Sequence, residues 1–162
     1  MDLFDMHSLP NWEDHRMLQR HLREDGWKEE AQMKAARELY NKWREIFLYV
    51  ESYCDTLQNI SDYEYTDKNK ELIGQNLFIV APKIIGAAGT GHYILKMENA
   101  AIIRRNCCEL LDQIRFTTAV GAGERKYANV IEREMDIFRG LFKEWVRTFV
   151  KDGYTDDWGL YI

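Results

Sequence analysis

The sequence predicts an all-α protein: an antiparallel up-down four-helix bundle with a short N-terminal helix and an extended aromatic C-terminal tail. Three observations lead to this prediction. Apolar residues recur at steps of three and four along four long stretches, which is the period of a helix with one buried face. The 162 residues include only 2 prolines, and the short turn-rich runs of a β-sandwich or barrel are missing. Short polar or glycine-rich segments separate the stretches, as between antiparallel neighbours.

The chain begins with a polar leader that precedes the bundle. Ser8 and Pro10 can start a helix, because a serine caps the first turn and a proline fits inside it. We therefore expect a short helix from Asn11 to Arg23 that ends near Gly26. This divides the chain into the leader (1–27), the four-helix bundle (28–151) and the C-terminal tail (152–162).

The first two bundle helices are expected at about 28–59 and from Thr66 or Asp67 to about Gly89. The apolar stripe of the first is Ala36, Leu39, Trp43, Ile46, Val50, Tyr53, Leu57 and Ile60, with Tyr40, Phe47 and Cys54 on one shoulder. The stripe of the second is Ile73, Leu77, Val80, Ile84 and Ala87. Pro82 should kink the second helix, because proline lacks the amide donor and clashes with the preceding turn.

The third and fourth helices are expected on either side of Gly121-Ala122-Gly123. The third begins near Gly91 and contains no interior glycine or proline, with a core centre at Ala100, Cys107 and Leu111. The fourth runs from about Glu124 to Val150, with the stripe Ala128, Ile131, Met135, Phe138, Phe142, Trp145 and Phe149. The tail that follows carries several large apolar and aromatic residues, so we expect it to fold back over the bundle or to contact another subunit.

Composition points to a cytoplasmic protein. A net charge of −5 argues against nucleic acid as a partner, because a nucleic-acid-binding surface is basic. The N-terminus lacks the charged and apolar regions of a signal peptide, and no apolar run approaches the ~20 residues of a membrane span. Three cysteines, two of them adjacent, fit free thiols in a reducing compartment better than a disulfide framework.

Two catalytic interpretations compete with a purely structural one. A ferritin-like metal site needs Glu-x-x-His pairs on the bundle helices, and the sequence contains none, so we expect no metal and no cofactor. A HEPN-like ribonuclease uses an arginine and a histidine for phosphate contact and acid-base work. Arg16 and His21 fit that loose spacing, but they lie in the leader rather than in the last bundle helices. Exposed surface residues are the favoured interpretation of both.

Arg104 is the most informative charged residue of the third helix. At about 100° per residue it lies about 40° from the core centre of that helix. Glu134 lies within the apolar stripe of the fourth helix, at a similar level in an antiparallel pair. A buried arginine needs a carboxylate, so we predict a buried Arg104–Glu134 ion pair, with a solvent-reaching arginine as the alternative. Cys107 and Cys108 could be redox-active, but buried cysteines acting as small hydrophobes are favoured.

The order of the helices resembles that of bacterial four-helix bundle proteins related to the ribosomal-RNA intervening-sequence proteins and to retroelement accessory proteins. The similar features are a first helix of the type Leu39-Tyr40-Asn41-Lys42-Trp43 and a second that ends as Ala81-Pro82-Lys83-Ile84-Ile85-Gly86-Ala87-Ala88-Gly89. The resemblance implies a ring-like homo-oligomer that binds partners rather than catalysing a reaction. The acidic charge of this chain departs from the basic members that associate with nucleic acid.

The sequence therefore favours a non-enzymatic helical bundle that acts through protein–protein contacts, as a homo-oligomer or with another protein partner. The aromatic tail and the wide apolar faces of the helices motivate this hypothesis. An RNA-associated protein or HEPN-like ribonuclease is the alternative, based on Arg16 and His21, and a ferritin-like metal protein is a weaker one.

Overall fold

A computed structural model describes residues 9–14, 26–58 and 66–160 of the chain. These residues contain four long α-helices, one short 3-10 helix and no β-strand, which confirms the predicted all-α class. The helices are α1 (Gly26–Asp55), α2 (Thr66–Gly89), α3 (Tyr93–Ala119) and α4 (Arg125–Arg147), with the 3-10 helix η1 (Trp12–Asp14) ahead of them.

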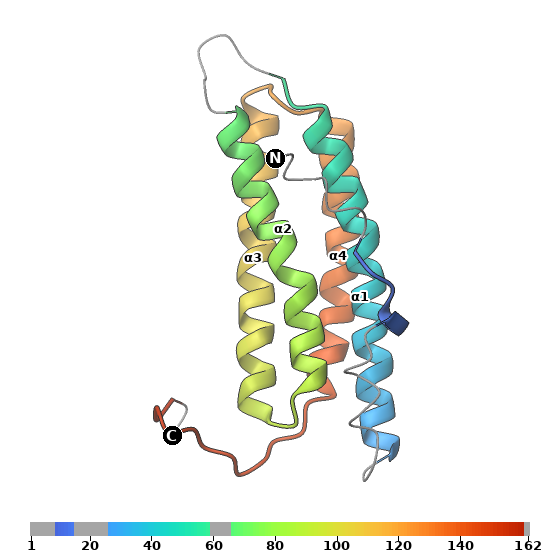
Figure 1. Cartoon of the computed structure of the whole chain (residues 1–162). Coiled ribbons are helices and arrows are strands. Elements are labelled where there is room, and N and C mark those ends of the chain that lie inside the picture. Colours follow the sequence, from blue (N-terminus) through green and yellow to red (C-terminus); the bar gives the residue numbers. More distant parts are fainter. Residues whose placement is uncertain (1–8, 15–25, 59–65, 161–162) are drawn as a thin grey trace.

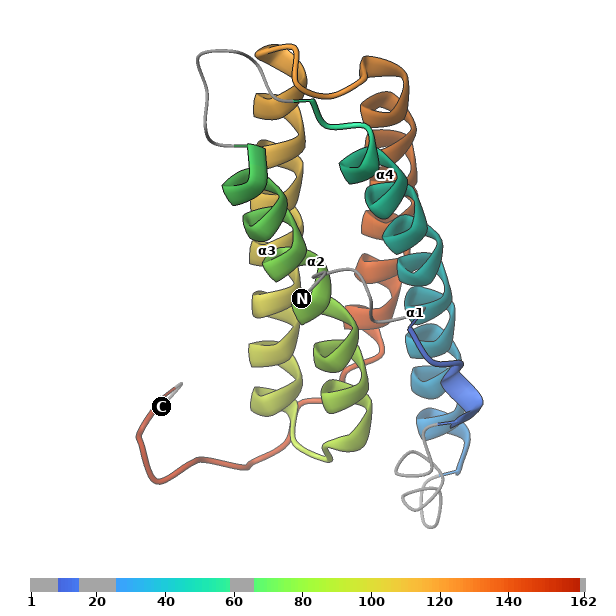
Figure 2. The ribbon, with the colours of Figure 1, turned by 45° about the horizontal axis from the view of Figure 1, so that its top comes forward.

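The four long helices lie side by side, and successive helices are joined at alternate ends of the molecule (Figure 1). Contacts are most extensive between α2 and α3 and between α1 and α4. They are least extensive between α3 and α4, although only residues 120–124 separate these two helices. Both views in Figures 1 and 2 show the chain after α4 leaving the end of the molecule where α2 is joined to α3.

The predicted apolar stripes form the core. Every described stripe and shoulder residue of α1 is buried, as are the five stripe residues of α2; Ile60 of the α1 stripe lies outside the described residues. On α4 the stripe is buried except for Phe142 and Phe149, which are only partly buried. Helix α2 continues through Pro82, whose side chain is exposed.

Residues 9–14 of the leader pack on α1. Of the helix predicted over 11–23, residues 11–14 are described and contain η1, residues 15–23 lie outside the described residues, and Gly26 is the first residue of α1. Trp12 is buried, with its ring 5.3 Å from that of Tyr40, and the Tyr40 hydroxyl donates to the Pro10 carbonyl at 2.9 Å. Burial of a large aromatic ring therefore holds this segment against the bundle.

The glycine-rich link ends α3 as predicted, and its two glycines have different roles. Gly121 has a φ of 81°, and the amides of Gly121 and Ala122 donate to the Thr118 and Thr117 carbonyls, which is a Schellman motif. At Gly123 an added Cβ would lie 2.1 Å from the Tyr53 hydroxyl oxygen. The first glycine therefore supplies a backbone conformation, and the second allows a tyrosine of α1 to reach the end of α3.

Helix α2 is, by length and composition alone, apolar enough to cross a membrane, and no other described helix is. The expectation that no apolar run approaches the length of a membrane span therefore does not hold for α2. A core helix of a soluble protein passes the same test. Nine residues of α2 are buried, and the helix contacts both α1 and α3, so its apolar character has a structural explanation in the core.

Candidate functional site

An apolar groove lies between α3 and α4, the pair of neighbouring long helices with the least extensive contact. It holds about 370 Å³ of space, part of which is open to solvent. It is lined by Ile103, Arg104, Cys107, Cys108 and Leu111 of α3 and by Met135, Phe138, Arg139 and Phe142 of α4. Arg104 and Arg139 are exposed and are its only charged lining residues, so the groove is an apolar surface with two cations beside it.

Beside the groove, α4 packs the ring of Phe138 against α1. The Phe138 ring lies 5.2 Å from that of Trp43 on α1, and Trp145 is fully buried between Phe142 and Phe149, at 5.8 and 4.8 Å. Phe142 is at the edge of this aromatic cluster, so part of its ring faces the groove. Covering that ring with another apolar side chain would be favourable, at about 25 cal/mol per Å² of area removed from water.

The structure does not bring Arg104 and Glu134 together, so the predicted buried pair is wrong. Arg104 is exposed, and no ion pair among the described residues joins it to Glu134. Glu134 instead accepts from the Lys42 Nζ of α1 at 2.8 Å, and Lys42 also contacts Glu45 at 2.5 Å. Hydrogen bonds to Glu134 and then to Glu45 raise the pKa of Lys42.

The physical reason is the direction in which α4 is turned. Glu134 is partly buried beside Lys42 because α4 packs mainly on α1. Arg104 faces the opposite flank of α4, where the groove leaves room for its side chain to reach water. The solvent-reaching arginine, the alternative that the sequence left open, is the one that the structure shows.

The paired cysteines differ from each other. Cys107 is buried, and burial raises the pKa of its thiol, with a smaller contribution from Cys108. Cys108 is exposed beside the groove, and both are free. Burial likewise raises the pKa of Cys54 to about 12. Because the thiolate is the reactive form, the two buried thiols are suited to packing rather than to redox chemistry.

The catalytic interpretations gain no support from the described part of the chain. No cluster of three or more histidine, cysteine, aspartate or glutamate side chains in that part could hold a metal ion. Arg16 and His21, the basic pair of the ribonuclease alternative, lie outside the described residues, so the geometry of that pair stays untested.

A second feature that the sequence indicated only in outline is the C-terminal arm, defined here as residues 150–160. It follows α4 without further helix, passes the N-terminal end of α3 and continues beyond it, away from α1 (Figures 1 and 2). Its apolar side chains are largely in solvent: Trp158 is 91% exposed, Val150 57% and Leu160 54%. The arm does not fold back over the core.

Asp152 fixes the start of the arm to α3. Its Oδ2 accepts a hydrogen bond from the Tyr93 amide at 3.2 Å and lies 3.4 Å from the His92 Nδ1. Because this is the N-terminal end of α3, the negative charge of the carboxylate also interacts favourably with the helix dipole. The Tyr154 ring stacks on His92 at 3.8 Å between centroids. Desolvation raises the pKa of Asp152, but hydrogen bonds from Tyr93, Tyr154 and His92 outweigh it and lower the pKa overall.

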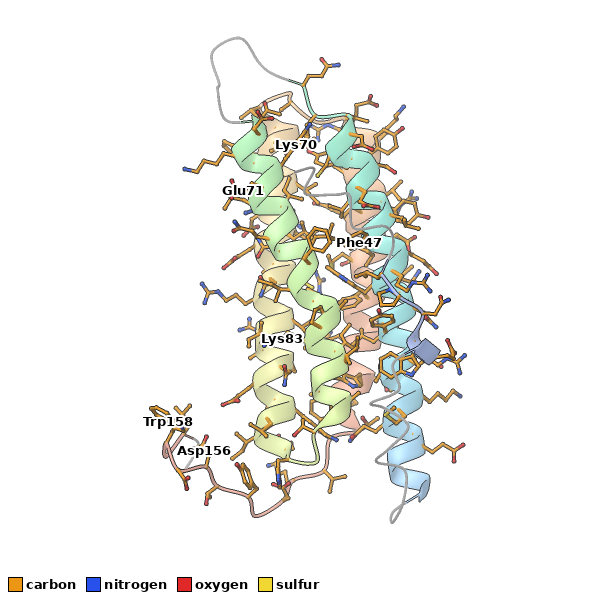
Figure 3. All side chains as sticks on the ribbon, in the orientation of Figure 1. Phe47, Lys70, Glu71, Lys83, Asp156 and Trp158 are labelled. Atoms are coloured by element: carbon orange, nitrogen blue, oxygen red, sulfur yellow. The ribbon has the colours of Figure 1, made fainter. Side chains whose placement is uncertain are left out.

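The end of the arm is a tight turn that presents Trp158 to solvent. The Asp156 Oδ1 accepts from the Trp158 amide at 3.1 Å, and the Gly159 amide donates to the Asp156 carbonyl at 3.3 Å. Gly159 has a φ of 72°, a conformation that glycine adopts without strain. In Figure 3 Asp156 and Trp158 both lie well away from the four helices. The indole is thus exposed by a locally ordered turn.

Comparison of the chain with known proteins supplied no family for this site. No protein-family model, no curated protein and no solved structure matches it. The resemblance to the intervening-sequence proteins therefore stays a prediction. The groove and the arm have to be interpreted from their own chemistry.

Proposed function

We propose that the chain is an antiparallel up-down four-helix bundle of the cytoplasm that acts through protein–protein contacts, as a homo-oligomer and without catalysis. The observation that carries this proposal is the exposure of large apolar side chains on the arm, above all Trp158 at 91%. Tryptophan is enriched at the centres of protein interfaces. A contiguous exposed apolar surface is a feature of binding sites more than of monomers.

The outer face of α2 supports the same proposal. Leu72 and Ile79 are 36% and 38% exposed, and their spacing of seven places them on one side of the helix, with the exposed Pro82 nearby. From Leu72 to Gly89 the only charged residue is Lys83. A charge-poor helix face of this kind fits lateral packing between bundles, as the resemblance to ring-forming proteins also implies.

The test is the mass of the purified protein in solution. We expect light scattering at micromolar concentration to give a multiple of the 19.3 kDa chain mass. Ile79→Lys should lower that mass if the α2 face contributes. Asn129→Lys, which adds the same charge at an exposed position on α4, should not. A monomer at every concentration, with no protein partner retained, would contradict the proposal.

A further inference from the structure

We propose that the C-terminal arm of one copy binds the α3–α4 groove of a second copy, with Trp158 in the groove and Asp157 beside Arg104. The inference rests on the proposed function and names the contact that would build the oligomer. Arm and groove are separate regions of the described chain, and in this structure neither is covered by the other.

Shape and polarity are the first argument. The groove is lined by apolar atoms of both helices and leaves Phe142 only partly covered. The arm supplies two exposed apolar side chains, Trp158 and Leu160, next to the turn at Gly159. The turn at Asp156 already orders the backbone at Trp158, which reduces the conformational entropy lost on binding.

Charge is the second argument, and it selects the partner. The cations beside the groove are Arg104 and Arg139. Arg139 contacts Asp136 at 2.9 Å, whereas Arg104 forms no ion pair within the described residues. The arm is acidic at the matching place: Asp157 is exposed directly before Trp158, while Asp156 is engaged in the turn. An arginine beside an indole can also stack on its face.

Reach is the third argument, and it favours a second copy over the groove of the same chain. With Tyr154 stacked on His92, four residues lead to Trp158 and span at most about 14 Å. The groove begins at Ile103, 10 residues or about 15 Å along α3 from Tyr93, and its middle at Cys107 is 14 residues or about 21 Å away, so the arm of the same chain reaches only the near end of the groove. The arm also points beyond α3, away from the bundle (Figures 1 and 3).

Each copy offers one arm and one groove, so two copies can exchange arms in a two-fold dimer, or successive copies can bind head-to-tail. Head-to-tail contacts are heterologous and produce a closed ring when the rotation between copies closes and an open filament when it does not. The exposed face of α2 would be free to contribute to the same assembly.

Cross-linking between two differently substituted chains tests the contact directly. The arm donor carries Leu160→Cys and Cys108→Ser, and the groove donor keeps the exposed Cys108 and carries Trp158→Ala. After mixing and mild oxidation we expect a covalent heterodimer on a non-reducing gel. Its matched controls are an arm donor with Lys151→Cys in place of Leu160→Cys, and a groove donor with Cys108→Ser; neither should give the heterodimer, which a mass tag on the groove donor separates from disulfide-linked homodimers. A chain with both Leu160→Cys and Cys108 that closes on itself as a cross-linked monomer would overturn the proposal.

Affinity provides the second measurement. Trp158→Ala should weaken self-association about tenfold or more, as expected for a tryptophan at the centre of an interface. Arg104→Asp and Asp157→Arg should each weaken it, and the chain that carries both should recover, because every arm then meets a groove of opposite charge. Unchanged assembly of Trp158→Ala would refute the arm contact and leave the proposed function standing. A monomeric intact protein would refute both.

Discussion

Helix α4 packs extensively against α1 but only loosely against α3, although α3 is its neighbour in the chain. On the α1 side, Phe138 is 2% exposed and its ring packs against Trp43. Lys42 donates a hydrogen bond to Glu134, and the side-chain amide of Gln32 donates to the Thr148 carbonyl at 2.8 Å. On the α3 side there is the groove and, nearer the link, an exposed ion pair between Arg115 and Glu132 at 2.6 Å.

The difference shows that α1 does not cover the whole apolar stripe of α4. Phe142 belongs to that stripe, but it is only partly buried and lines the groove. The groove flank is where the proposed partner would add contacts, and the following predictions probe the two flanks of α4 and the link between α3 and α4.

The largest expected effect distinguishes two phenylalanines one turn apart on α4. Phe138→Ala should lower the free energy of unfolding by roughly 3–5 kcal/mol, because it opens a cavity against Trp43. Phe142→Ala should cost about 1 kcal/mol, because its ring is already partly in solvent. Guanidinium denaturation measures the free energy of unfolding of both variants. Similar losses in the two would show that the two flanks of α4 contribute equally to stability.

The link between α3 and α4 should show the next largest effect. Gly123→Ala should destabilise the protein by about 1–3 kcal/mol, since its methyl group overlaps Tyr53, whose hydroxyl also contacts Thr117 and Thr118 at 2.6 and 2.8 Å. Gly121→Ala should cost about 1 kcal/mol for its positive φ alone. Thermal melting of the two variants compares the free-energy cost of the steric overlap at 123 with that of the positive φ at 121. An unchanged melting temperature of Gly123→Ala would show that the contact with Tyr53 does not fix the end of α3.

The ion pair on the α1 flank should contribute less. Glu134→Gln should lower the free energy of unfolding by about 1 kcal/mol, as for a hydrogen bond to a charged group. The pKa of Lys42 is raised above its model-compound value of 10.5, so its stabilising contribution is complete below pH 10.5 and is lost as the pH rises through the raised value.

Urea denaturation at neutral and strongly alkaline pH measures this dependence. The wild-type protein should lose more stability than Glu134→Gln across that interval. Equal losses in the two proteins would show that the Lys42–Glu134 pair is not the source of the pH dependence.

The smallest effect is expected on the groove flank. Arg104→Gln should change the free energy of unfolding by no more than a few tenths of a kcal/mol, because the side chain is exposed and forms no ion pair within the described residues. The same urea experiment measures it. A loss comparable with that of Glu134→Gln would reinstate a structural role for Arg104.

Helical periodicity determined most of the fold in advance. The predicted stripes coincide with the buried residues of α1 and α2, and the end of α3 at Gly121 was predicted from glycine alone. These features are local, since a three-four spacing fixes which face of a helix is apolar and a glycine permits a positive φ. The pattern also placed large apolar residues on the tail, without indicating that Asp152 would hold it at His92.

What only the tertiary structure decided is which neighbour each face meets. The position of Glu134 in the stripe does not show whether it faces Lys42 on α1 or Arg104 on α3. Both helices lie beside α4, and a rotation of α4 about its own axis would exchange the two partners. Unequal packing decided it: α4 packs Phe138 against Trp43 of α1 and Glu134 lies beside Lys42, while Arg104 is exposed beside the groove. Residue spacing along one helix carries no information on that rotation, since it is fixed by the combined packing of all four helices.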